Sequence, residues 1–162
     1  MAQSAYARDK VLTLQDVLSA LEDRQGQCIV LTNGCFDLLH VGHVRSLEYA
    51  ASLGSRLIVG INDDASVQAL KGSGRPLLPA AERAELIAAL ACVDMVTMFA
   101  ERTAEHLAAA VKPDVYVKGG DYGEESLPEA AIVRAHGGRV VLAPLIDGRS
   151  TSLIIEQIRS AS

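Results

Sequence analysis

Residues 28–43 read CIVLTNGCFDLLHVGH, and this stretch predicts a buried strand, a turn and the start of a helix. Cys28 to Thr32 is a continuous apolar run of strand length. Val44, Leu47 and Ala51 follow at a spacing that places them on one face of a helix. A buried strand that leads directly into a helix is a unit of a parallel α/β sheet, so the stretch indicates the fold class.

The same alternation continues along the chain. Further apolar runs of strand length lie at 57–61, 93–99, 114–118 and 139–143, and helices are predicted over about 14–24, 80–92, 103–111 and 126–136 and after Ser150 or Ser152. Thr13–Asp16 and Ser126–Glu129 have the spacing of a capping box. The pattern predicts one domain over 1–162, with a helical N-terminal extension over 1–26. Its fold is a Rossmann-like α/β three-layer sandwich with a five-stranded parallel sheet. Ligands then bind at the carboxyl ends of the strands, where the strand order reverses.

Composition excludes several classes of protein. The chain carries 15 basic and 20 acidic residues, a net charge of −5, and shows no run of Lys or Arg, so we expect no nucleic-acid partner. Aromatic residues make up 4%, too few for a surface that stacks single-stranded bases. No apolar stretch reaches the length of a membrane span. Cys28, Cys35 and Cys92 are odd in number and widely spaced, which indicates reduced thiols and a cytoplasmic location.

The turn after the first strand carries the chemistry. Backbone amides at a strand-to-helix turn hold phosphate, and Gly34 would let that backbone approach a ligand closely. His40 and His43 stand three apart, so one helical turn presents both rings on one side, and Gly42 between them leaves room for a polyphosphate. A surface pair and a zinc pair are the alternatives, and zinc is disfavoured because we find no further ligand set beside them. The glycines do not follow the dinucleotide spacing GxGxxG.

With these residues the chain resembles the HxGH nucleotidylyltransferase superfamily, and more closely its cytidylyltransferase-like members. Matching segments follow at 62–67, 71–76, 82–83, 118–122 and 150–152. Together they are similar to the D-glycero-β-D-manno-heptose 1-phosphate adenylyltransferases, the adenylyltransferase half of bacterial ADP-heptose synthases. The resemblance implies transfer of AMP from ATP, with Mg²⁺, onto heptose 1-phosphate, giving ADP-heptose for lipopolysaccharide core or another heptose-containing surface glycan. It also implies a homodimer or higher homo-oligomer.

The resemblance also implies roles for individual residues. The catalytic residues would be His40, His43 and Lys71. The nucleotide would be bound by Thr32, Asn33, Gly34, Phe36, Gly42, Lys118, Gly120, Asp121, Ser150, Thr151 and Ser152. The acceptor would be bound by Cys35, Asp37, Asp63, Arg75 and Arg83. We expect no metal ligands among the protein side chains.

Two expectations concern charge near the phosphates. Many superfamily members have a basic residue after the Ser150–Ser152 motif, whereas Leu153 follows it here, so Lys71 is the natural substitute. Gly72 and Gly74 make the segment around Lys71 and Arg75 pliable, which predicts a mobile lid over the phosphates.

The chemistry fits these residues independently of the resemblance. A sugar 1-phosphate is already anionic, so its attack on the α-phosphorus needs alignment and hydrogen-bond donors rather than a protein base. Cys35 therefore need not be a nucleophile. Alternatives remain: an enzyme that joins CTP to glycerol 3-phosphate, one that joins ATP to a flavin precursor, and a nucleotide-binding module without turnover. Lys118–Tyr122 favours the heptose type by resemblance.

Overall fold

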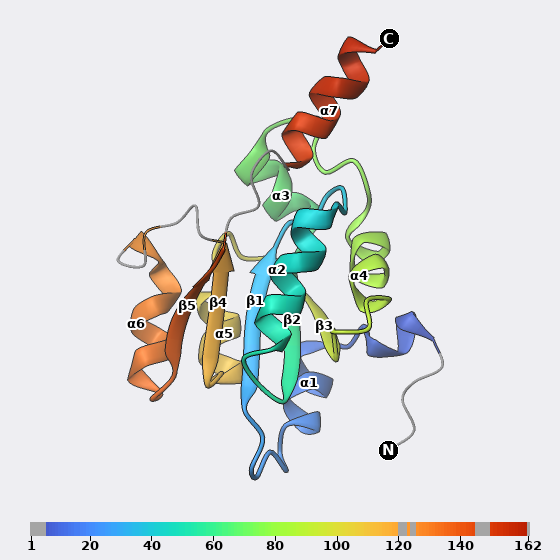
Figure 1. The fold of residues 1–162 in the computed structure, drawn as a ribbon. Coiled ribbons are helices and arrows are strands. Elements are labelled where there is room, and N and C mark those ends of the chain that lie inside the picture. The colour runs from blue at the N-terminus through green and yellow to red at the C-terminus, as the bar shows by residue number, and fades with distance from the viewer. Residues whose placement is uncertain (1–5, 120–122, 124–125, 145–149, 162) are drawn as a thin grey trace.

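The computed structural model describes residues 6–119, 123, 126–144 and 150–161, and its helices surround one sheet (Figure 1). The elements in chain order are η1 (Ala7–Lys10), α1 (Leu14–Ala20), β1 (Ile29–Gly34), α2 (Val41–Ala51), β2 (Arg56–Asn62), α3 (Asp64–Lys71), α4 (Ala80–Ala88), β3 (Met95–Phe99), α5 (Glu105–Val111), β4 (Val115–Gly119), α6 (Pro128–Ala135), β5 (Arg139–Ala143) and α7 (Thr151–Ser160).

The five strands form a parallel sheet in the order β3-β2-β1-β4-β5. The chain moves outward from β1 to β3 and then crosses back to β4, so the strand order reverses between β1 and β4. Ligands of doubly wound sheets bind beyond the carboxyl ends of the strands at such a point. The predicted fold class and all five predicted strands are confirmed.

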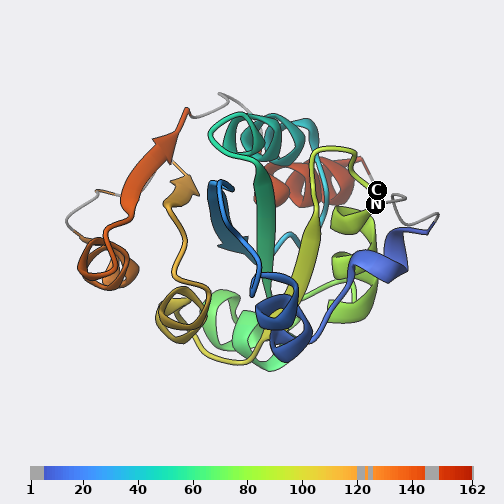
Figure 2. The ribbon, with the colours of Figure 1, turned by 90° about the horizontal axis from the view of Figure 1, so that it is seen from below.

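The sheet has a core on each face because successive side chains of a strand point to opposite sides. Val30 of β1 packs with residues of α2 and α4, including Leu47 and Ile87. Its neighbours Ile29 and Leu31 pack in the other cluster with residues of α1, α5 and α6. Figure 2 shows α2 and α4 on one side of the sheet and α1 and α5 on the other. Strands buried on both faces explain the continuous apolar runs in the sequence.

The N-terminal segment is part of this core. Val17 of α1 is fully buried and packs against the sheet, and Val11 forms a parallel bridge to Val96 of β3. Within the predicted extension over 1–26, α1 therefore contributes directly to the core.

Some predicted helix boundaries are wrong. The Ser126–Glu129 capping box does not form, because Pro128 at the first helical position moves the helix start. The hydroxyl of Ser126 donates to the Gly123 carbonyl, and Glu129 accepts from the backbone N–H of Ala104 at 2.8 Å. Helices α1 and α4 also end a few residues earlier than predicted, and α3 was not predicted as a helix.

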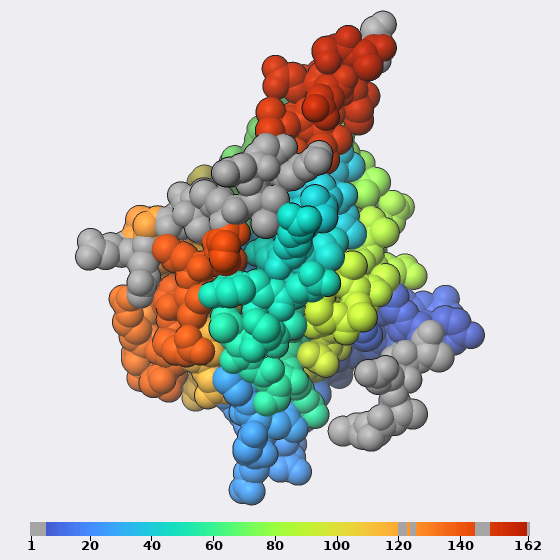
Figure 3. Space-filling model, in the orientation of Figure 1, coloured from blue at the N-terminus to red at the C-terminus, as the bar shows by residue number. Residues whose placement is uncertain are grey.

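Helix α7 lies beyond the carboxyl ends of the strands and α2 lies in front of the sheet (Figure 1). The space-filling view shows α7 standing out from the body of the molecule (Figure 3). None of the residues of α7 is buried. A hollow of about 470 Å³ lies between α7 and the segment 71–77. Across the described residues, no helix combines the length and the apolar character needed to cross a bilayer.

Candidate active site

A cleft of about 630 Å³ lies at the carboxyl ends of the strands and brings most of the predicted site residues together. The predicted residues that line it are Thr32, Asn33, Gly34, Cys35, Phe36, Asp37, His40, His43, Lys71, Arg75, Lys118, Ser150, Thr151 and Ser152. They come from four chain segments, at the ends of β1 and β4 and at α3 and α7. The carboxyl ends of parallel strands meet at one edge of the sheet, which explains why segments so far apart in sequence converge there.

The two histidines form a reciprocal cap at the start of α2. The Nδ1 atom of His40 accepts from the Gly42 backbone N–H at 3.1 Å, and Nδ1 of His43 accepts from the His40 backbone N–H at 3.3 Å. The rings stack with centroids 3.8 Å apart. Because Nδ1 is an acceptor in both neutral rings, the remaining ring hydrogen lies on Nε2. The arrangement thus fixes the tautomer and the orientation of both rings at the cleft.

His43 stays neutral well below physiological pH. Burial is the largest cause, and the neighbouring His40 adds to it, so that the pKa of His43 falls from 6.5 to about 4, although a hydrogen bond with the Leu38 backbone acts in the opposite direction. A neutral imidazole can donate one hydrogen bond without bringing a full charge into the site. His43 is therefore a hydrogen-bond donor at neutral pH rather than a cation.

The turn between β1 and α2 is shaped by Phe36. This residue has a φ of 47°, in the left-handed region, and its ring meets the His43 ring edge-on at 5.2 Å. A Cβ atom on Gly34 would lie 2.9 Å from the Phe36 ring. Gly34 thus makes room for the Phe36 ring, and it also lines the cleft, so its predicted close approach to a ligand stays a prediction. Gly42 provides the backbone N–H that orients His40.

Cys35 lies on this turn and lines the cleft. Burial raises the pKa of its thiol, while the nearby charges of Lys71, Arg83 and Lys118 act to lower it. A raised pKa keeps the sulfur protonated, and the thiolate is the nucleophilic form. This direction is consistent with the prediction that Cys35 need not be a nucleophile.

Lys118 at the end of β4 is held by the neighbouring strand. Its Nζ atom donates to Oδ1 of Asn33 at 3.1 Å, and the hydroxyl of the fully buried Tyr116 donates to the same oxygen. Tyr116 and Lys118 are two residues apart on one strand, so both side chains lie on one face and reach the same acceptor. Asn33 thereby holds the Lys118 ammonium group near the carboxyl ends of β1 and β4, between which the strand order reverses.

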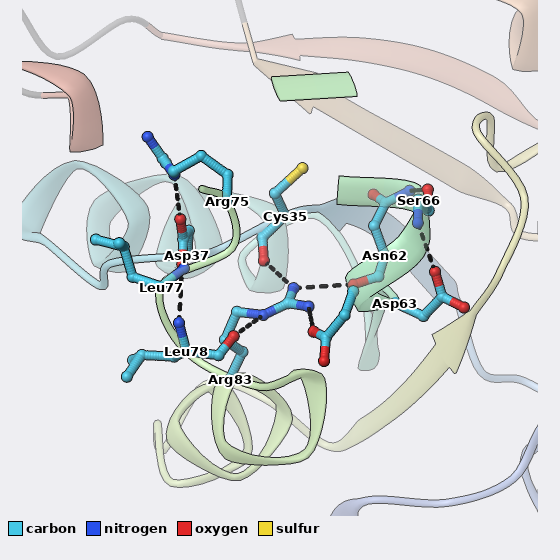
Figure 4. A network of polar contacts seen from close by, with 10 residues as sticks. Cys35, Asp37, Asn62, Asp63, Ser66, Arg75, Leu77, Leu78 and Arg83 are labelled. Atoms are coloured by element: carbon cyan, nitrogen blue, oxygen red, sulfur yellow. Dashed lines mark hydrogen bonds and ion pairs between the residues drawn. The ribbon is translucent and has the colours of Figure 1, made fainter. Parts of the chain in front are cut away.

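Asp37 fastens the segment that follows α3 to the turn after β1. Its Oδ1 atom accepts the backbone N–H groups of Leu77 at 2.7 Å and Leu78 at 3.2 Å, and its Oδ2 atom is paired with Arg75 Nε (Figure 4). The Asp37 side chain is 2% exposed. Asp37 therefore anchors the segment from Arg75 to Leu78. Lys71, at the end of α3, is exposed and lines the cleft.

Arg83 does not line the cleft, contrary to its predicted role in binding the acceptor. Its guanidinium group is fully buried and donates to the carbonyl oxygens of Leu78, Cys35 and Asn62 and to a carboxylate oxygen of Asp64 (Figure 4). These partners lie on the turn after β1, at the end of β2 and before α4. Arg83 is thus a buried brace that ties three segments together beneath the cleft.

The structure also gives Asp63 a role that differs from the predicted binding of the acceptor. Its Oδ1 atom caps α3 by accepting the Ser66 backbone N–H at 2.7 Å, and the residue does not line the cleft. Asn62, the last residue of β2, lines it instead. Asp is among the preferred N-cap residues of helices, so the residue type at position 63 could have revealed this.

Other residues that the sequence did not predict also line the cleft, among them Arg102, Thr103 and Glu129. The first two follow β3, and position at the carboxyl end of a strand was the available signal. Glu129 had been interpreted as part of a helix cap, so its place in the cleft follows only from packing.

The hydroxyls before α7 are engaged within the protein. The Ser150 side chain caps α7 by accepting the Leu153 backbone N–H, and the Thr151 hydroxyl donates to the Leu38 carbonyl at 3.2 Å. This last bond connects the start of α7 to the histidine turn. The predicted site residues Gly120 and Asp121 lie outside the described residues.

Metal binding by the protein alone has no support in the described part of the chain, where no group of three or more His, Cys, Asp or Glu side chains could hold an ion.

Comparison with known proteins agrees with this geometry. The sequence profile described as cytidylyltransferase-like matches residues 31–156. The chain is 53% identical over 151 residues to the bifunctional protein HldE of Pseudomonas paraeruginosa, covering 92% of this chain and 32% of that protein. It is 51% identical over 146 residues to HldE of Syntrophotalea carbinolica, covering 90% of this chain and 30% of that protein. The chain thus spans about a third of the length of these curated relatives.

Solved structures give the same result for the fold. A lipopolysaccharide core biosynthesis protein from Thermoplasma volcanium aligns with a TM-score of 0.65 and 27% identity, over 75% of this chain and all of that one. Pantothenate synthetase from Thermus thermophilus aligns with a TM-score of 0.59 over 85% of this chain and 62% of that one, at 15% identity, which supports the fold alone. The profile match spans most of the sequence, so the chain belongs to the cytidylyltransferase-like family.

Proposed function

We propose that this member of the cytidylyltransferase-like family is an adenylyltransferase that moves AMP from ATP to D-glycero-β-D-manno-heptose 1-phosphate. The products would be ADP-heptose and pyrophosphate, and ADP-heptose would serve the synthesis of lipopolysaccharide core or another heptose-containing surface glycan. Two similarities support this choice of substrates: about half of the residues are identical to HldE proteins, and the chain has the fold of a lipopolysaccharide core biosynthesis protein. We expect the enzyme to work in the cytoplasm as a homo-oligomer.

The observation that carries the proposal is the stacked pair His40 and His43 at the start of α2. The acceptor phosphate oxygen attacks the α-phosphorus of MgATP, and the bond from that phosphorus to the bridging oxygen of pyrophosphate breaks. Negative charge grows on the phosphate oxygens during this exchange. Donors that are already oriented stabilise such charge without reorganisation, and the reciprocal cap orients both rings before substrate arrives.

The cations of the cleft suit the remaining charge. Lys118, held by Asn33, lines the cleft at the end of β4, and we assign it to the nucleotide phosphates. Lys71 is exposed at the cleft beside the start of α7, and we assign it to the leaving pyrophosphate together with Ser152. Arg75 keeps its terminal guanidinium nitrogens for the acceptor phosphate, since the contact with Asp37 uses Nε.

The test is a screen of nucleoside triphosphates against phosphorylated acceptors, with pyrophosphate release as the readout. We expect turnover with ATP and heptose 1-phosphate and little with CTP or glycerol 3-phosphate. Preference for CTP with glycerol 3-phosphate would identify the other branch of the family, and tight ATP binding without turnover on any acceptor would identify a binding module.

A matched variant tests the role of the histidines. His43→Ala should lower kcat by about 10²–10³, the usual effect of losing one transition-state donor, with the fold retained. Ser46→Ala, one helical turn further along the wall of the cleft, is the control and should retain activity. Near-normal turnover of a folded His43→Ala protein would refute the assignment.

A further inference from the structure

Glu129 carries a buried oxygen that has no partner within the described residues. Three buried side-chain oxygens are in this position there, on Gln27, Thr97 and Glu129, and of the three residues only Glu129 lines the cleft. Buried polar atoms in proteins nearly always have a hydrogen-bond partner. A donor from outside the described residues is therefore needed most clearly at Glu129, where a ligand can supply it.

The structure holds this carboxyl group in one orientation. Glu129 lies in the first turn of α6 and is 2% exposed. Its Oε1 atom accepts the Ala104 backbone N–H at 2.8 Å, which ties the start of α6 to the start of α5. With Oε1 engaged, Oε2 is the acceptor that remains for a ligand.

The chemistry of the group limits which part of the substrate it can meet. A carboxylate only accepts hydrogen bonds and repels phosphate, so it suits a neutral part of the ligand that carries O–H groups. The cations Lys71 and Lys118 and the two histidines provide the environment for phosphate elsewhere in the cleft. The uncharged residues Thr103, Ser126 and Leu127 line the cleft together with Glu129.

We propose that Glu129 is a specificity residue whose Oε2 accepts a hydrogen bond from a sugar hydroxyl of the substrate. This inference rests on the proposed function, which provides two sugars with the required chemistry: the ribose of ATP and the acceptor sugar. Both present hydroxyl donors, and they are distinguished by the test below.

The test uses Glu129→Gln in the full chain. Glutamine keeps a carbonyl oxygen for the Ala104 N–H and replaces the free acceptor with an NH₂ donor. We expect KM for one substrate to rise about 10- to 100-fold, as for loss of a hydrogen bond to a charged group, while kcat changes less than about threefold. Thr97→Val is the matched control, because it removes the unpartnered buried oxygen that lies outside the cleft, and it should leave both KM values unchanged.

The affected substrate identifies the sugar. If the donor is the ribose, KM for ATP rises, and the unaltered enzyme discriminates against 2′-deoxy-ATP or 3′-deoxy-ATP while the variant does not. If the donor is the acceptor sugar, KM for heptose 1-phosphate rises and both proteins treat the deoxynucleotides as they treat ATP.

Separate calorimetric titrations of ATP and of heptose 1-phosphate into both proteins keep the two proposals distinguishable. An inactive unaltered chain would refute the proposed function, and these affinities would still decide the role of Glu129. Unchanged affinity for both ligands would overturn the inference, as would a lower melting temperature with unchanged KM values, which would identify a purely structural contact.

If Glu129→Gln does not fold, affinities of the unaltered chain for the deoxynucleotides and for deoxy-sugar 1-phosphates decide. Equal affinity for every analogue overturns the inference.

Discussion

Replacing Arg83 with methionine tests most directly whether this residue braces the cleft or binds substrate. Its guanidinium is fully buried and satisfies three backbone carbonyls, those of Leu78 and Asn62 at 2.9 Å and that of Cys35. Methionine fills a similar volume but donates no hydrogen bond. The variant therefore leaves three carbonyl oxygens beneath the cleft without their donor.

The structure allows the size of this loss to be worked out. Each buried acceptor left without a partner costs about 1–3 kcal/mol, although the larger values do not simply add, and breaking a buried charged contact costs about 3–5 kcal/mol in total. The ion pair to Asp64 adds little, because the Asp64 side chain is 53% exposed and water replaces its partner. We expect Arg83→Met to lower the free energy of unfolding by about 3–5 kcal/mol.

Urea denaturation followed by circular dichroism measures the effect. The midpoint should fall with little change in slope, and Asp64→Asn, the control that removes only the exposed partner, should lose less than about 1 kcal/mol. At temperatures where the variant is folded, KM for the acceptor should change modestly. An Arg83→Met protein of normal stability with a large rise in acceptor KM would refute the brace and restore the substrate-binding role predicted from the sequence.

Three more outcomes follow from the site. Because the pKa of His43 is lowered to about 4, the folded state takes up a proton less readily than the unfolded state, so up to about 3 kcal/mol of stability should be present above pH 6.5 and lost as the pH falls from 6.5 to 4. Urea denaturation at several pH values should show that the free energy of unfolding of His43→Asn falls less between pH 6.5 and pH 4 than that of the unaltered protein. An equal fall in both proteins would contradict the lowered pKa of His43. Asp37→Asn should lower the free energy of unfolding by about 1–3 kcal/mol, because it weakens the hold on two backbone N–H groups and unpairs Arg75, and an unchanged denaturation midpoint would show that these contacts contribute nothing. Lys71→Ala should leave the melting temperature almost unchanged and reduce kcat about 10- to 100-fold, whereas full activity would remove this exposed lysine from the mechanism.

The sequence by itself determined the layers of the protein and the centre of the site. Apolar runs at the five strands are local signals, and strands buried on both faces occur in parallel sheets covered by helices. The turn from Thr32 to His43 was also readable, because the strand, the glycine, the two histidines and the helix start are consecutive in the chain. Such features depend on residues within one or two turns of each other, so their spacing carries the information.

Only the tertiary structure decided what the buried charged residues do. The family resemblance assigns Arg83 to the acceptor, but its partner Cys35 lies 48 residues away, and no local pattern reports such a contact. Glu129 had the spacing of a helix cap, and its actual partner, Ala104, belongs to another helix 25 residues earlier. A charged side chain is stable when buried only if its hydrogen bonds are satisfied, and here those partners are brought together by the crossovers of the sheet. Asp63 differs from these two residues, because it caps its own helix and its local sequence could have shown this, whereas Asn62, one residue earlier, is placed in the cleft by the end of β2.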